Sequence, residues 1–131
     1  MPATGTTTRI TEVRTVGIHV DDQDRALAFY VDKLGFEKRM DASFGEGERW
    51  VEVAPRGAAT SIALVRASDA LSAGIDTGLR LASEDAAADH ATLRTLGVDV
   101  DPEVIPYPVP MFPFRDPDGN RLIIVEQPAG R

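Results

Sequence analysis

Few side chains in this sequence are suited to catalysis or metal binding. The 131 residues include no cysteine and only two histidines, His19 and His90. Without cysteine the chain has no disulfide, no thiolate nucleophile and no cysteine-ligated zinc or iron–sulfur site. With two histidines, a catalytic triad or a histidine-rich metal site is severely constrained.

The charge of the chain disfavours some partners and favours others. The formal net charge is −7, and such a surface repels the phosphate backbone of nucleic acids. We therefore expect no nucleic-acid partner. The same acidic field keeps a protein soluble and attracts cationic ligands.

Neither a membrane span nor a signal peptide is predicted. No apolar run approaches the roughly 20 residues that cross a bilayer. Residues 1–8 lack a basic segment followed by an apolar one, and we expect residues 1–10 to form a flexible tail. These patterns predict a cytoplasmic protein with no membrane partner.

The elements that must position any site recur twice along the chain. Residues 15–22 alternate as a half-buried strand does and lead into acidic residues, and residues 78–85 repeat that pattern. Helical patterns follow over residues 24–34 and 86–96. In the first of them, apolar residues at i, i+3, i+4 and i+7 form a stripe that should face a sheet; these are Leu27, Tyr30, Val31 and Leu34.

Both copies also end and turn alike. Each helical pattern stops at a Leu-Gly pair, at Gly35 and at Gly97, as expected of a helix C-cap. Pro-x-Gly turns follow at residues 55–57 and 117–119, between strand-like runs. Elements that recur in order at one spacing predict an internal repeat. The sequence thus predicts one α+β domain over residues 1–131, made of two βαβββ modules at about 11–68 and 76–127 with a cleft between them.

Several of these residues resemble a known family. They are the strand that leads into Asp21-Asp22, the helix with Ala28-Phe29-Tyr30, and the turn Asp116-Pro-Asp-Gly-Asn120 before a final strand. The resemblance covers residues 11–127 and is to the vicinal oxygen chelate superfamily, which includes glyoxalase I, extradiol dioxygenases, fosfomycin-resistance enzymes and bleomycin-resistance proteins. It implies a cleft that holds a divalent metal, with one ligand on the first and one on the last strand of each module.

The positions that the resemblance assigns to metal ligands carry unsuitable residues. None offers the imidazole, carboxylate or thiolate donors that divalent metals usually take. We therefore predict no metal, no cofactor and a place in a metal-free branch of the superfamily. The four positions are occupied by Thr15, by Ala63 or Ser61 depending on the alignment, by Gly78 and by Ile123.

The two histidines have different expected environments. His19 shares a strand face with Thr15 but lies about 13 Å farther along, so it cannot simply replace the missing ligand. A cleft contact, a plain strand-end histidine and a displaced metal ligand all remain open for His19. His90 lies in the second helical pattern, where a solvated helix position is expected.

Strand alternation predicts which side chains line the cleft. The more apolar faces, with Val16, Ile18, Leu79, Leu81, Leu122 and Ile124, should pack under the helices. Val51 and Val53 should also face the helices, which turns Trp50 and Glu52 toward the cleft. The internal repeat places Phe112 and Phe114 at the positions of Trp50 and Glu52, so we expect both phenylalanines to face the cleft as well. An ordinary core role for Trp50 and the two phenylalanines is the alternative. The predicted ligand-binding residues are Thr15, His19, Trp50, Glu52, Arg80, Phe112, Phe114 and Ile123.

Two further segments border the predicted cleft. Residues 101–110 contain four prolines and should be extended and irregular; they form either a lid that carries Tyr107 or a stiff connector. Residues 41–47, with Phe44 and two glycines, are the flexible counterpart in module one.

An aromatic and aliphatic cleft with few polar groups suits a planar organic molecule, and an acid among aromatic rings suits a cation. The first hypothesis is therefore a metal-free protein that binds a hydrophobic or aromatic, possibly cationic, small molecule such as an antibiotic, with no catalytic residue. The alternatives are a metal-free enzyme that uses Glu52 or His19 as a base, and a glyoxalase-like or dioxygenase-like metalloenzyme. The resemblance also implies a homodimer with each cleft near the interface.

Overall fold

The computed structural model describes residues 7–127 and shows two four-stranded sheets. The predicted tail lies outside the described residues over 1–6. In the first module the strand order is β1-β4-β3-β2, and β1 and β4 run parallel. The elements of this module are β1 (Thr15–Val20), α1 (Gln23–Ala28), the π-helical turn η1 (Phe29–Lys33), β2 (Glu37–Ser43), β3 (Arg49–Ala54) and β4 (Ser61–Arg66).

The second module repeats this topology. Its strand order is β5-β8-β7-β6, with β5 and β8 parallel, so the prediction of two βαβββ modules in an α+β fold is confirmed. Within residues 7–127, no helix is both long and apolar enough for a membrane span. The elements of this module are β5 (Asp76–Ser83), α2 (Ala86–Thr95), β6 (Asp99–Val100), β7 (Met111–Arg115) and β8 (Arg121–Glu126).

The helices begin and end where the sequence patterns place them. The carboxylates of Asp22 and Asp85 cap the two helices by accepting from the backbone N–H groups of Arg25 and Ala88, each at 3.0 Å. Such side-chain acceptors satisfy N–H groups that have no partner within a helix. Gly35, with φ of 77°, follows the first helical segment in the left-handed conformation that glycine adopts without strain.

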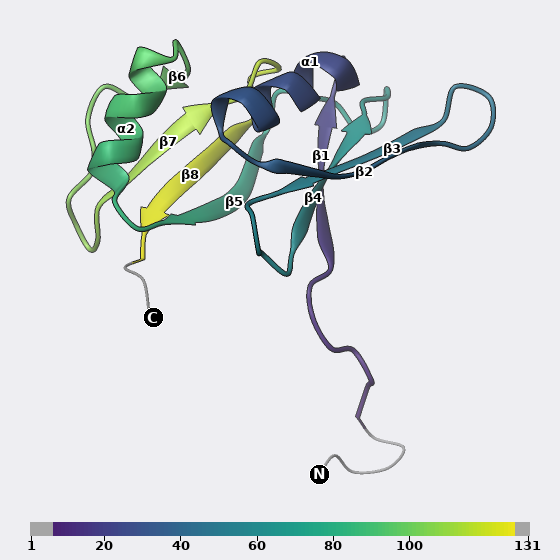
Figure 1. The fold of residues 1–131 in the computed structure, drawn as a ribbon, viewed down its shortest axis with the longest axis horizontal. Coiled ribbons are helices and arrows are strands. Elements are labelled where there is room, and N and C mark those ends of the chain that lie inside the picture. The colour runs from purple at the N-terminus through teal and green to yellow at the C-terminus, as the bar shows by residue number, and fades with distance from the viewer. Residues whose placement is uncertain (1–6, 128–131) are drawn as a thin grey trace.

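The two modules share one core on the helix side of their sheets. Figure 1 shows the sheets side by side, with α1 and η1 between them and α2 beside β7. The ring of Phe29 stacks on that of Phe114 in the other module, with centroids 6.3 Å apart. Ile18, Leu122 and Ile124 are buried as predicted, and Leu79 and Leu81 pack against the same core.

Phe112 and Phe114 lie in this core, so the prediction that they line the cleft is wrong. Both are fully buried, and they pair across the sheet with Ile124 and Leu122, which face the helices. The prediction used the offset of 62 between the turn prolines. The second module has one more residue between its third strand and the proline, and a slip of one residue moves every side chain to the opposite face.

A buried polar network joins the modules at the turn of residues 116–120. The side-chain amide of Asn120, with no exposed surface, donates to the carbonyl of His19 at 2.9 Å and to Asp116 at 3.0 Å. Its oxygen accepts from the N–H groups of Gly74 and Ile75 at 2.8 and 3.1 Å. One side chain therefore ties β1, the segment between the modules and the final hairpin together.

Tyr30 extends this network to the first helix. Its hydroxyl donates to Asp116 at 3.0 Å. Burial, with the neighbouring charge of Asp116, raises the pKa of Tyr30 well above its usual range, so the hydroxyl stays protonated as a donor. The adjacent Asp118 accepts from Arg25 at 2.6 Å and from the N–H of Asp21 at 3.2 Å, which gives a second tie between α1 and the same turn.

Replacing Asn120 should destabilise the whole fold. Asn120→Ala removes the buried bond to Asp116 and leaves the part-buried N–H groups of Gly74 and Ile75 and the carbonyl of His19 without their partner, so we expect a loss of about 3 kcal/mol in the free energy of unfolding. Urea denaturation would measure this. The exposed Asp32 on η1 offers the control, since Asp32→Ala should change stability by less than about 0.5 kcal/mol. Equal stability of the two variants would contradict the role given to Asn120.

Candidate functional site

The sheet of module one has a face that no helix within residues 7–127 covers. The residues Gly17, Ala63, Glu52 and Met40 form one row across β1, β4, β3 and β2 on this face. Gly17 and Met40 at the ends of the row are exposed, whereas Glu52 is 4% exposed. A carboxylate is thus held nearly buried at the centre of an open sheet face, where an unpaired charge would be costly.

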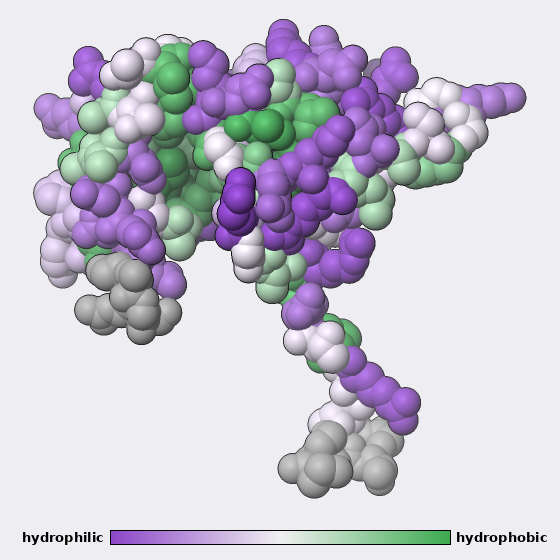
Figure 2. Space-filling view, viewed as in Figure 1, coloured by the Kyte–Doolittle hydropathy of each residue, from purple (hydrophilic) through white to green (hydrophobic). Residues whose placement is uncertain are grey.

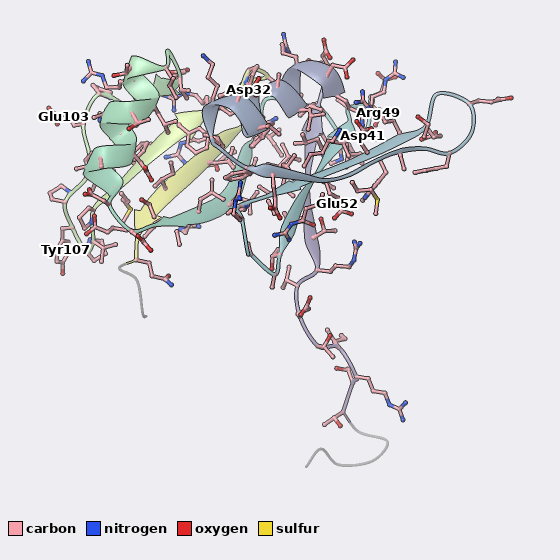
Figure 3. The ribbon with its side chains drawn as sticks, viewed as in Figure 1. Asp32, Asp41, Arg49, Glu52, Glu103 and Tyr107 are labelled. Atoms are coloured by element: carbon pink, nitrogen blue, oxygen red, sulfur yellow. The ribbon has the colours of Figure 1, made fainter. Side chains whose placement is uncertain are left out.

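Three donors surround Glu52. The indole N–H of Trp50 donates to Oε2 at 2.6 Å, and the hydroxyl of Ser61 donates to Oε1 at 2.7 Å. A guanidinium nitrogen of Arg14, whose side chain is 65% exposed, lies 3.4 Å from Oε2. Figure 3 places Glu52 on the side of the sheet away from α1.

These donors keep Glu52 ionised. The hydrogen bond from Trp50 lowers the pKa of Glu52 most, followed by the bond from Ser61 and the charge of Arg14, while burial opposes them. Hydrogen bonds to the charged form of a carboxyl group favour that form. At neutral pH the site therefore presents a fixed negative charge beside an indole ring.

Thr15 belongs to the same cluster. Its hydroxyl donates to the carbonyl of Ser61 at 3.2 Å, and the Ser61 hydroxyl lies 3.0 Å from it. The register places Ser61 opposite Thr15 and Ala63 opposite Gly17. Of the two residues considered for the second metal-ligand position, Ser61 is therefore the one beside Thr15. Residues 7–127 hold no cluster of three or more histidine, cysteine, aspartate or glutamate side chains that could share a metal. The absence of a bound metal remains a prediction.

A groove of about 470 Å³ adjoins the cluster at the tip of the β2–β3 hairpin. Trp50 and Val65, both on the open face, form one wall, and Phe44, 57% exposed, forms part of the other. Glu46 and Glu48 add two carboxylates to the lining, and Arg49 and Arg66 add two guanidinium groups. Residues 41–47 were expected to be flexible and the groove was not predicted, although an aromatic residue close to two acids is a sequence signal for such a site.

Ion pairs fix the hairpin that carries Trp50. Arg49 binds both carboxylate oxygens of Asp41 on β2 at 2.9 Å and Asp24 on α1 at 2.7 Å. These carboxylates raise the pKa of Arg49, and the guanidinium lowers that of Asp41. β2 accordingly extends to Ser43, farther than predicted. Figure 3 shows Arg49 and Asp41 together above the hairpin.

The two histidines lie in different environments. His19 lies on the open face opposite Val65, and within residues 7–127 its ring makes no hydrogen bond. His90 is 8% exposed, its Nε2 lies 2.7 Å from the carbonyl of Asp101, and its ring meets Phe112 edge-on at 4.9 Å. The prediction of a solvated His90 is therefore wrong, because α2 turns this residue toward β7.

The remaining predicted residues lie on the open face of the second sheet. Arg80, Ile123 and Pro113 form a row across β5, β8 and β7. Arg80 is exposed and donates to the carbonyl of Gly78 at 3.1 Å. In the described part of the chain, no hydrogen bond or ion pair joins this row to the Glu52 cluster, so the predicted set divides between two open faces.

The proline-rich segment of residues 101–110 does not cover the Glu52 cluster. Tyr107 is 82% exposed and lies at the opposite side of the molecule from Glu52 in Figure 3. Ile105 pairs with Met111 at the start of β7. Of the two interpretations, a connector agrees with this placement and a lid over Glu52 does not.

Comparisons with known proteins agree with the fold. The family model described as Glyoxalase/Bleomycin resistance protein/Dioxygenase superfamily matches residues 12–124. A superfamily member from Sphaerobacter thermophilus is 38% identical with a TM-score of 0.83, covering 92% of this chain and all of its own. TnmS3, an antibiotic binding protein from Streptomyces sp. CB03234, is 36% identical with a TM-score of 0.80, over 92% and 98% of the two chains. The uncharacterized protein YetH of Bacillus subtilis is 30% identical, over 89% of this chain and 99% of its own.

The hydrogen bonds to Glu52 should appear in the pH dependence of stability. Because the pKa of Glu52 is lower in the folded chain than its ordinary 4.5, its contribution is full above pH 4.5 and is lost as pH falls through the folded value. Glu52→Gln should lower the free energy of unfolding by about 1–3 kcal/mol at pH 7, and the difference should shrink below pH 4.5. Glu103→Gln, at an exposed position, is the control. A difference independent of pH would contradict the ionised state.

Proposed function

Because the chain belongs to the Glyoxalase/Bleomycin resistance protein/Dioxygenase superfamily, we propose that it is a metal-free binding protein for aromatic, cationic small molecules such as antibiotics. The observation that carries the proposal is the ionised, nearly buried Glu52 held against the indole of Trp50 on an open sheet face. A carboxylate beside an aromatic ring attracts a cation through both charge and the ring face.

The groove at the hairpin tip supplies the apolar part of this site. Its volume of about 470 Å³ lies in the range of small-molecule pockets. Phe44 and Trp50 can contact a planar ring, and Glu46 and Glu48 offer carboxylates to a cation beside the guanidinium groups of Arg49 and Arg66. The similarity to TnmS3, which is an antibiotic binding protein, supports this class of ligand.

The electrostatics support binding more than catalysis by Glu52. A general base works best with a pKa near the operating pH, whereas the donors around Glu52 lower its pKa. A carboxylate saturated by Trp50, Ser61 and Arg14 has little basicity to offer a substrate. It remains an effective fixed charge for a ligand cation.

Calorimetric titration with a matched pair of probes tests the proposal. A 2-naphthylmethylammonium salt should bind with one site per chain, and the neutral 2-naphthylmethanol should bind at least about tenfold more weakly. Glu52→Gln should remove this preference for the cation, since it removes the charge. Trp50 is the only tryptophan, so NMR spectra of the protein contain a single indole N–H resonance, and this resonance should shift when the ammonium probe binds. Equal affinity for the two probes, or no shift of that resonance, would overturn the proposal.

A variant of Arg14 should have the opposite effect on the affinity for the ammonium probe in the same titration. Its exposed guanidinium sits 3.4 Å from Glu52, where a ligand cation would compete with it. Arg14→Gln should therefore tighten binding of the ammonium probe by several fold. Arg9→Gln removes the same charge from an exposed position of the arm and should leave the affinity unchanged.

We also propose that the protein is a homodimer in which each open face lies near the interface. The arm of residues 7–14 supports this, because it leads away from the sheet in Figure 1 and exposes Ile10 by 81% and Val13 by 65%. Apolar side chains on a projecting segment gain free energy when a partner covers them.

Light scattering should give twice the mass of the chain at micromolar concentration. Val13→Asp places a charge on the arm and should shift the protein toward monomer, while Ala70→Asp, on an exposed loop, should not. A wild-type protein that stays monomeric at 100 μM would refute the dimer without affecting the test of ligand binding.

A further inference from the structure

A second cavity lies between the modules on the helix side of the sheets. Its volume is about 290 Å³, which is near the lower end of small-molecule pockets. One wall is formed by the end of η1, the turn that follows it and the β3–β4 hairpin, and the other by α2, β5 and β8. Figure 2 shows hydrophobic surface in the hollow between α2 and the first module.

The interior of this cavity is apolar. Phe36, Leu93 and Ile124 line it, and each is less than 10% exposed and belongs to the shared core. On the side of module one, η1 ends at Lys33 and the chain turns at Gly35, and both residues line the cavity. Leu81 and Ile124 lie on the helix-facing side of their sheet, which separates the cavity from the open face with Ile123.

The rim of the cavity is cationic in a chain of net charge −7. Lys33 and Arg56 line it from module one. Lys33 donates one hydrogen bond across the module boundary, to the carbonyl of Leu96 at 2.7 Å, which leaves two of its donors. Arg56 is exposed and has no hydrogen-bond or ion-pair partner among residues 7–127.

The acidic residue of the rim is already engaged. Asp89 on α2 accepts from the hydroxyl of Ser83 at 2.5 Å. That bond holds Asp89 against β5 and occupies one of its oxygens. With two cations and one carboxylate the rim keeps a net positive charge, which together with the apolar interior complements a ligand with an anionic head and a short apolar body.

We propose that this cavity is a second ligand site, specific for small amphiphilic carboxylates, with the carboxylate at Arg56 and Lys33 and the apolar chain against Phe36, Leu93 and Ile124. The site is opposite in charge preference to the Glu52 cluster and lies on the other side of the sheets. It does not depend on the proposed function of that cluster.

NMR titration of the ¹⁵N-labelled full chain with octanoate tests this inference, with octylammonium and octanol as probes of equal chain length. Octanoate has about ten non-hydrogen atoms, and a dissociation constant on the order of 0.1–1 mM is expected for a ligand of that size. Saturable shifts should appear at the amides of Leu34, Phe36, Leu93 and Ile124. Octylammonium should bind there at least about tenfold more weakly.

Two pairs of variants assign the site. Arg56→Gln should weaken octanoate binding about tenfold, because it removes the charge-assisted hydrogen bonds of the head group, while Arg94→Gln, at an exposed α2 position outside the cavity, should not. Thr92→Trp, at the rim, should block the cavity, whereas Thr95→Trp, one turn away from it and exposed, should not. A dispersed NMR spectrum of each variant verifies that it is folded.

The indole N–H of Trp50 separates this inference from the proposed function, because it should not move with octanoate and should still respond to the naphthyl ammonium in Arg56→Gln. Shifts confined to Trp50 and its neighbours would overturn the inference. So would an absence of saturable shifts, equal binding of octanoate and octylammonium, or unchanged affinity in both Arg56→Gln and Thr92→Trp.

Discussion

The buried amide of Asn120 is the constraint on which the arrangement of the two modules depends. It joins the end of β1, the segment at residues 74–75 and the carboxylate of Asp116, and Asn120 itself has no exposed surface. A buried polar group without a partner costs more than a hydrogen bond normally contributes. The network therefore penalises any other relative position of the modules, and Tyr30 extends that penalty to the first helix.

The position of β1 that results determines the Glu52 cluster. Asn120 holds β1 at its His19 end, and β1 pairs with β4 so that Thr15 lies opposite Ser61. Ser61 in turn donates to Glu52, so the charge at the open face follows from the register of two strands. On the helix side of the sheets, the shared core leaves the cavity beyond η1, with Lys33 and Arg56 at its rim. The same packing arrangement thus produces two surfaces that carry side chains of opposite charge.

Local residue patterns predicted the helices and strands. The orientations of side chains that depend on the exact number of residues between strands, or on packing between distant segments, were not predicted. Caps at Asp22 and Asp85 and the glycine after each helix carry their information in adjacent residues. The sheet face on which Phe112 and Phe114 lie depends on a single extra residue before the turn, which the offset between the two repeats does not reveal. His90 was placed in solvent because nothing in its helix predicts that Phe112 and the carbonyl of Asp101 would cover it. The groove at Phe44 requires a hairpin held by ion pairs that span distant residues.

The turn motif that identifies the family is also the one that carries no information about the ligand. The side chains of Asn120 and Asp116 are engaged in the junction between the modules, so a chain can keep the fold whatever occupies its open faces. Among the positions that the resemblance assigns to metal ligands, Thr15 donates to the carbonyl of Ser61, and the Ser61 hydroxyl donates to Glu52. Both hydroxyl protons are therefore used within the chain. The exposed Arg14 pairs with the same carboxylate, and an organic cation that replaced Arg14 would leave the bonds from Trp50 and Ser61 in place.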